Sequence, residues 1–244
     1  MKKLTVMLAL AAIMAVGLPG AAYTSEPLTG HLDVFAGQIL ATGGWNPPGD
    51  NTDAVFNWTV TQATDQIRGV YWNYAYQFKV AKKGISHVII QTSTTATAAN
   101  FWDPITNLAI GGPQLYTSSD GNSNPGMLHD MFGLKFETPN GSDVLDWSVS
   151  FNSDRRPVKG NFYAKDGVQG TIDVTAWNTA FTGDSPTGSD LGAPVLLDGT
   201  SADNWIAVPD SITANTVLPE ASSVLLGVLG LMSSGGYLRL RRRA

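Results

Sequence analysis

The residue types that catalyse most hydrolytic reactions are scarce in this sequence of 244 residues. It contains three histidines, His31, His87 and His129, and no cysteine. It has neither a Gly-x-Ser-x-Gly nucleophile elbow nor a His-Glu-x-x-His zinc motif. His87 lies within an apolar run, which favours a buried imidazole over a metal ligand. The sequence therefore supports neither a serine or cysteine hydrolase nor a zinc protease.

Paired carboxylates are the other grouping that could do chemistry, because glycosidases place two of them across a sugar. The chain has 20 acidic residues, of which 17 are Asp. Asp143 and Asp146 form the closest pair on an expected strand, but a spacing of three places them on opposite faces. We therefore expect no enzymatic activity, and a secreted glycoside-active enzyme is the least favoured alternative.

A short Asx-rich segment carries oxygen ligands at alternate positions, as in the first half of a calcium loop. These residues are Asp120, Asn122 and Asn124. Pro125 stands where such a loop has its turn glycine, and Met131 where it has the bidentate glutamate. An ordinary turn fits this segment better, so we assign no metal or cofactor and keep calcium as the one ion to consider.

Five residues could contact a polysaccharide. Trp45, Trp102 and Trp205 lie beside Pro, Asn or Asp and outside the alternating runs, which favours loop positions where a ring can stack on a sugar. The adjacent Arg155 and Arg156 could bind a carboxylate or sulfate of an acidic polymer. The simpler alternatives are core packing for the tryptophans and a structural ion pair or solvated edge for the arginines.

The elements that must position these residues are strands. In Val70–Val80, one parity is Val, Trp, Tyr, Tyr, Phe, Val and the other is Tyr, Asn, Ala, Gln, Lys. This period of two indicates a strand with one buried and one solvated face. The other strand candidates are Phe56–Thr61, Ile85–Gln91, Phe132–Phe136, Leu145–Phe151, Val158–Lys165 and Thr171–Trp177, with room for one helical turn near Ala96–Trp102. We expect an all-β fold, namely an antiparallel β-sandwich that could be a jelly roll.

The composition and net charge of the chain argue against one class of function, the binding of nucleic acid. Charged residues make up 14% of the chain and the net charge is -5. Without residues 1–22 and 218–244, nine basic and 19 acidic residues remain, so that part carries about -10. An acidic chain with no basic stripe is not expected to bind nucleic acid.

The N-terminus has the pattern of a secretory signal peptide. Lys2 and Lys3 precede an apolar run, Leu4–Leu18, which ends at Pro19 and the small residues that follow it. This order predicts export and cleavage after Ala22.

The C-terminus combines three features in order. Pro219 and Glu220 precede the apolar run Val224–Met232. The chain then ends in the arginines Arg239, Arg241, Arg242 and Arg243. A helix over residues 224–238 would span about 22 Å, which is short for a permanent membrane anchor. The arginines would hold the extreme C-terminus on the cytoplasmic side.

This C-terminal order resembles the PEP-CTERM sorting signal of Gram-negative bacteria, with Ala221 in place of the second proline of the usual Pro-Glu-Pro motif. The resemblance implies processing by the membrane protease exosortase in bacteria that make extracellular polysaccharide. A second resemblance, to uncharacterised PEP-CTERM surface proteins, implies a shared architecture and brings no known activity. It rests on Gly84–Ile90, Asn124–Met127, Ser153–Val158 and Asn161–Gly167.

These observations predict a signal peptide (1–22), a β-sandwich domain (23–217) and a sorting signal (218–244). We expect an exported cell-surface or extracellular-matrix protein with a non-catalytic structural or adhesive role. A polysaccharide-binding module of the matrix is the alternative. Signal peptidase and exosortase would be the processing partners, extracellular polysaccharide a further partner, and the C-terminal helix would insert transiently into the inner membrane.

Overall fold

The computed structural model describes residues 27–45, 54–106, 109–118, 123–139, 143–182 and 204–211. The predicted signal peptide and the sorting signal both lie outside these ranges. Within them, no helix is long and apolar enough to cross a membrane. Most of the described residues lie in strands, helix is limited in them to two 3-10 turns, and all their strand pairs are antiparallel. The expectation of an all-β antiparallel fold is confirmed.

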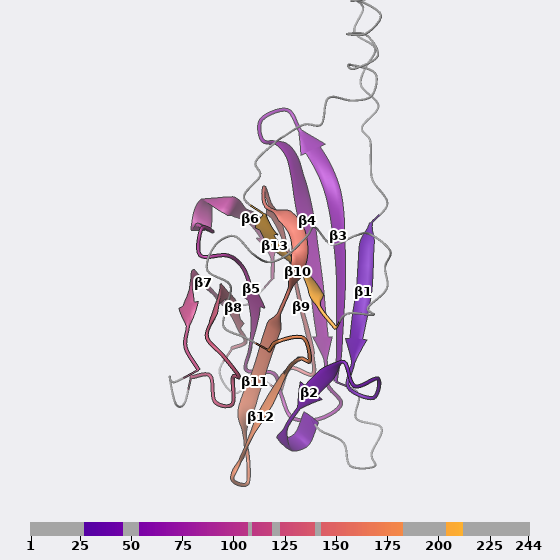
Figure 1. Ribbon diagram of the computed structural model, residues 1–244, viewed down its shortest axis with the longest axis vertical. Coiled ribbons are helices and arrows are strands. Elements are labelled where there is room, and N and C mark those ends of the chain that lie inside the picture. Colours follow the sequence, from indigo (N-terminus) through magenta and orange to yellow (C-terminus); the bar gives the residue numbers. More distant parts are fainter. Residues whose placement is uncertain are drawn as a thin grey trace, which may run out of the picture.

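Two sheets make up most of the structure (Figure 1). The first sheet has the strand order β1 (Leu28–Asp33), β3 (Val55–Asp65), β4 (Gly69–Lys79), β9 (Asp146–Ser153) and β6 (Phe101–Ile105). The second sheet has the order β2 (Ile39–Ala41), β12 (Ile172–Asn178), β11 (Phe162–Gln169), β5 (His87–Gln91), β8 (Met131–Glu137) and β7 (Ala109–Tyr116). Two 3-10 turns, η1 (Gly43–Trp45) and η2 (Ala98–Asn100), precede β3 and β6.

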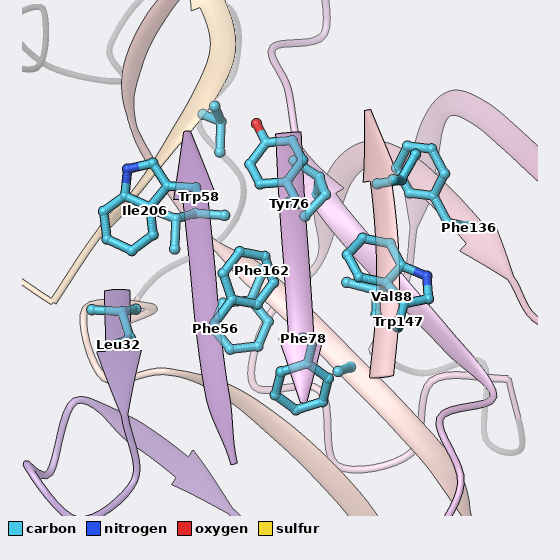
Figure 2. Packing of buried hydrophobic residues seen from close by; sticks show 14 of the residues in the cluster. Leu32, Phe56, Trp58, Tyr76, Phe78, Val88, Phe136, Trp147, Phe162 and Ile206 are labelled. Carbon is cyan, nitrogen blue, oxygen red and sulfur yellow. The ribbon is translucent and has the colours of Figure 1, made fainter. Parts of the chain in front are cut away.

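The inner faces of the two sheets meet in an aromatic core (Figure 2). Phe56 of β3 lies opposite Phe78 of β4 in the first sheet. Phe162 of the second sheet stacks on Phe56, with a centroid separation of 4.2 Å. The β3–β4 register also sets Trp58 opposite Tyr76 on the same face. One parity of each long strand therefore builds the core, as the alternation predicts.

A third, two-stranded ribbon fills the space between the sheets. It pairs β10 (Arg156–Gly160) with β13 (Ile206–Ser211). Val158 and Ile206–Val208 belong to the same core cluster as the two sheets. Gly160 allows this close approach, because a Cβ atom there would lie 2.2 Å from a methyl group of Val208.

A loop covers part of the outer face of the second sheet. Tyr163 donates a hydrogen bond to the carbonyl oxygen of Pro125 at 2.6 Å, which ties this loop to β11. Met127 packs with Tyr163 and Ile89 in a second, smaller apolar cluster. Asp130 accepts hydrogen bonds from the backbone and hydroxyl groups of Ser118, which holds the two ends of the loop together.

Some strand predictions need correction. Residues 158–165 do not form one strand. Asn161 interrupts the strand, so that the residues before it belong to β10 of the ribbon and those after it to β11 of the second sheet. Leu145 precedes β9 and is exposed, although its parity predicts burial. Two other predictions hold: β5 is a fully buried inner strand of the second sheet, and η2 supplies the helical turn.

Candidate functional site

Trp45, a predicted ligand contact, is a core residue. Its side chain is 1% exposed and packs edge-on against Phe78 with a centroid separation of 5.4 Å. Its indole nitrogen donates to the carbonyl oxygen of Lys83. The Pro- and Asn-rich sequence after it suggests a loop, but η1 turns the ring inward. Trp45 therefore has no open face on which a sugar could stack.

The adjacent arginines point to different environments. Arg155 is 5% exposed, and its Nη2 donates to Ser93 Oγ at 2.5 Å and Thr95 Oγ1 at 2.8 Å. Arg155 thus ties the end of β9 to the segment that follows β5. Arg156 is half-buried and lies over the ring of Trp72, with Cζ 5.8 Å from the centroid. Of this predicted pair, only Arg156 remains within reach of a ligand.

Trp102 lies at the edge of the outer face of the first sheet. It pairs with Asn152 of β9, whose side chain also points outward from that sheet. The ring of Tyr71 contacts it, with a centroid separation of 5.7 Å. The guanidinium of Arg68 lies over the indole, with Cζ 4.1 Å from the centroid. Three side chains from β4, β6 and the β3–β4 turn therefore meet on one surface.

Amide side chains extend this surface across the sheet. Asn73 of β4 donates to Asn152 Oδ1 at 3.0 Å, and Asn152 in turn donates to Asp103 Oδ2 at 3.4 Å. Asp103 has φ 48°, and the pairing register of β6 shifts after Trp102. This irregularity turns the chain where the carboxylate of Asp103 meets the amides. Rings, amides and a carboxylate side by side are the groups that protein surfaces offer to sugar rings and hydroxyls.

The remaining predicted contacts do not join this surface. Trp205 is half-buried just before β13, and no ring contact or hydrogen bond between described residues connects it to Trp102. Asp120 and Asn122 lie outside the described residues. Asn124 is buried in the loop over the second sheet, and its Nδ2 donates to the carbonyl oxygen of Thr117. In the part of the chain that the structure describes, no three His, Asp or Glu residues are grouped as metal ligands would be.

His87 is buried on the outer side of β5, beneath the loop that carries Asn124. Burial, together with the nearby charges of Lys135 and Lys165, lowers the pKa of this imidazole to about 3. Its Nε2 atom makes no hydrogen bond, although the Asn124 amide lies next to it. A permanently neutral, covered imidazole is unsuited to acid–base catalysis near pH 7.

A small apolar cleft of about 130 Å³ opens between the edge strands of the two sheets. Phe101 and Pro104 of β6 line one side of it, and Ile110 and Gly112 of β7 line the other, above the core residue Phe151. Each edge strand contains a proline, Pro104 or Pro113, which lacks the N–H that an added strand would need.

Arg68 and Tyr71 are the site residues that sequence reasoning missed. Tyr71 has the outward parity of its strand, and Arg68 is one of only three arginines in residues 23–217. Both signals are visible in the sequence. That Arg68 and Tyr71 both contact Trp102 depends on the pairing of β4, β9 and β6, which strand periodicity does not reveal.

Comparisons with known proteins add no relatives. No protein-family model matches the chain, and neither a curated protein nor a solved structure gives a significant match.

Proposed function

We propose that this is an exported, surface-sorted protein with a non-catalytic adhesive role in the cell envelope or extracellular matrix. Residues 23–217 would form a single β-sandwich between the signal peptide and the PEP-CTERM-like sorting signal. Signal peptidase would remove residues 1–22. Exosortase would act near Pro219 and Glu220 while the C-terminal helix is transiently inserted in the inner membrane.

The observation that supports an adhesive role is the surface built by Trp102, Tyr71 and Arg68 beside the Asn73–Asn152 amide pair. These groups lie at the surface of a sheet whose other face packs in the core. This surface also favours the second candidate function, a polysaccharide-binding module, because rings and amides are the usual partners of sugars.

Two of the described carboxylates, those of Asp146 and Glu137, are held in ion pairs on strand surfaces. Asp146 forms an ion pair with Lys79 at 3.4 Å and accepts a hydrogen bond from Gln77. Glu137 forms an ion pair with Lys135 at 2.7 Å. Carboxylates paired in this way on strand surfaces do not form the facing acid and base that glycoside hydrolysis requires.

The sorting proposal is tested by the intact mass of the protein recovered from its native cell surface. We expect the loss of residues 1–22 and of everything beyond about 218–221. Recovery of a chain that still carries Arg239 and the terminal arginines would contradict the proposal.

The adhesive proposal is tested by binding of the purified protein to the extracellular polysaccharide of the producing strain. Trp102→Ala should weaken binding about tenfold, since removal of an aromatic anchor typically costs more than 1 kcal/mol. Ile105→Ala is the matched control, because Ile105 lies on the same strand and is 74% exposed. Equal binding by the wild type and Trp102→Ala would show that this surface is not the adhesive contact. Turnover of the polymer would instead identify an enzyme.

A further inference from the structure

We infer that the Trp102 surface recognises the carboxylate or sulfate groups of an acidic polysaccharide, through the guanidinium group of Arg68. This inference rests on the proposed adhesive function and specifies its ligand.

All three arginines of residues 23–217 gather at one end of the first sheet. Arg68 lies in the turn that joins β3 to β4, the hairpin at the top of Figure 1. Arg155 and Arg156 lie where β9 leads into β10. Only Arg68 lies on the outer face, because Tyr71 points outward and contacts Trp102 there, whereas its neighbour Trp72, which lies beneath Arg156, points to the inner face.

The indole of Trp102 orients the guanidinium group of Arg68 without using its hydrogen-bond donors. Arg68 lies 4.1 Å above the indole of Trp102, which is within stacking distance. A guanidinium that lies over a ring still directs its N–H groups outward in the guanidinium plane. Two adjacent N–H groups in that plane match the two oxygens of a carboxylate or sulfate.

No described carboxylate neutralises Arg68 or Arg156. The nearby acids accept hydrogen bonds from neutral donors instead. Asp65 accepts from the backbone N–H groups of Ile67 and Arg68 in the turn. Asp154 accepts from Asn100 at 3.0 Å. The contact of Asp103 with Asn152 is of the same kind. In the part of the chain that the structure describes, the two guanidinium groups therefore form neither an ion pair nor a hydrogen bond.

Unpaired arginines are notable in a domain that carries about -10 overall. The domain as a whole repels a polyanion, so local contacts must supply the attraction. A polymer can provide it, because its repeated charged groups engage several copies of the protein at a high effective concentration. Asp103 and the Asn73–Asn152 pair lie beside Trp102 and can hydrogen-bond the hydroxyl groups of the same sugar.

The test compares two pairs of polymers that differ only in charge, using the purified full-length protein. One pair is polygalacturonate and its fully methyl-esterified form, and the other is dextran sulfate and dextran. We expect the charged member of at least one pair to bind about tenfold or more tightly than its neutral partner. The pair that shows the difference identifies the anion as carboxylate or sulfate.

Variants locate the contact. Arg68→Gln should weaken binding to the charged polymer about tenfold, whereas Arg156→Gln, which changes an arginine over the inward-facing Trp72, should change binding less than twofold. Lys83→Gln removes the same charge from an exposed side chain beyond the far end of β4, and should change binding less than twofold. The 11 residues of β4 separate the two ends by about 35 Å. Arg68→Lys keeps the charge but loses the planar donor pair, so it should behave like Arg68→Gln.

The possible failures are distinguishable. Equal binding of charged and neutral polymers, with no effect of Arg68→Gln, would overturn the anion inference and leave the adhesive proposal standing. Full binding by Arg68→Lys would overturn the role of the paired guanidinium donors. If neither the four polymers nor the native polysaccharide binds, both the inference and the adhesive proposal fail.

Discussion

Shortening the chain before β13 should abolish cooperative folding, whereas ending it after Ser211 should leave the fold intact. β13 is the last described strand, and it ends shortly before the predicted sorting signal. Ile206, Ala207 and Val208 are 1%, 1% and 0% exposed. The strand therefore forms part of the core, although it lies close in sequence to the segment that exosortase would remove.

The magnitude follows from what β13 buries. Full burial of Ile206 and Val208 contributes about 1.5–3 kcal/mol each. Tyr76 donates a hydrogen bond to the carbonyl oxygen of Ala207 at 2.8 Å, and Asn178 donates to that of Asn204 at 2.9 Å. Loss of a buried partner costs about 1–3 kcal/mol for each donor. The total, about 5–12 kcal/mol, matches the entire stability of a typical domain.

The assay is urea unfolding of chains that end at residue 203, 211 or 218. Tryptophan fluorescence and circular dichroism monitor the unfolding. The two longer chains should unfold in one transition with the same midpoint. The chain that ends at residue 203 should show no cooperative transition. A cooperative transition at an unchanged midpoint for that chain would refute the assignment of β13 to the core. The expected result would also mean that removal of the predicted sorting signal leaves the fold unchanged.

Two further predictions concern tryptophan burial and pH. Trp147→Ala should lower the free energy of unfolding by about 3–5 kcal/mol, because Trp147 is 1% exposed and packs against Phe136. Trp72→Ala should cost less than half as much, because Trp72 is only partly buried at the core edge; equal losses in urea titrations would contradict this difference. The pKa of His87 is about 3 in the native state and about 6.5 when unfolded, so only the unfolded state takes up a proton between these values. The free energy of unfolding should therefore fall by up to about 1.4 kcal/mol per pH unit below pH 6.5. In urea titrations at several pH values, His87→Asn should lose this contribution to the dependence of stability on pH.

Strand periodicity predicted the all-β class and most inward-facing residues. The alternation over Val70–Val80 identified Tyr74, Tyr76 and Phe78 as core residues, and all three are buried. It also placed Trp72 on the inner face, but periodicity cannot show that this position lies where the core ends. The apolar run Ile85–Gln91 indicated an inner strand in the same way, because burial on both faces removes the alternation.

The candidate site was only partly predictable. Trp102 was selected from its polar neighbours, and the same reasoning selected Trp45, which η1 buries against Phe78. The side chains of two adjacent residues in extended chain point in opposite directions, so one arginine is expected to be buried and the other exposed. Which of the two is buried depends on its hydrogen-bond acceptors, Ser93 and Thr95, which are distant in sequence. Arg155 is therefore structural and Arg156 is accessible, a distinction that residue type alone cannot make.

The sequence by itself determined the strand-forming pattern, the net charge of residues 23–217 and the patterns that predict export and sorting, since each can be obtained without knowing which distant segments meet. Only the tertiary structure decided that Arg68 lies over Trp102, that Asn161 separates β10 from β11 and that β13 lies in the core. These features depend on which strands pair and on how the two sheets stack. Such contacts join segments far apart in the chain, and their stability comes from the surface that they bury together.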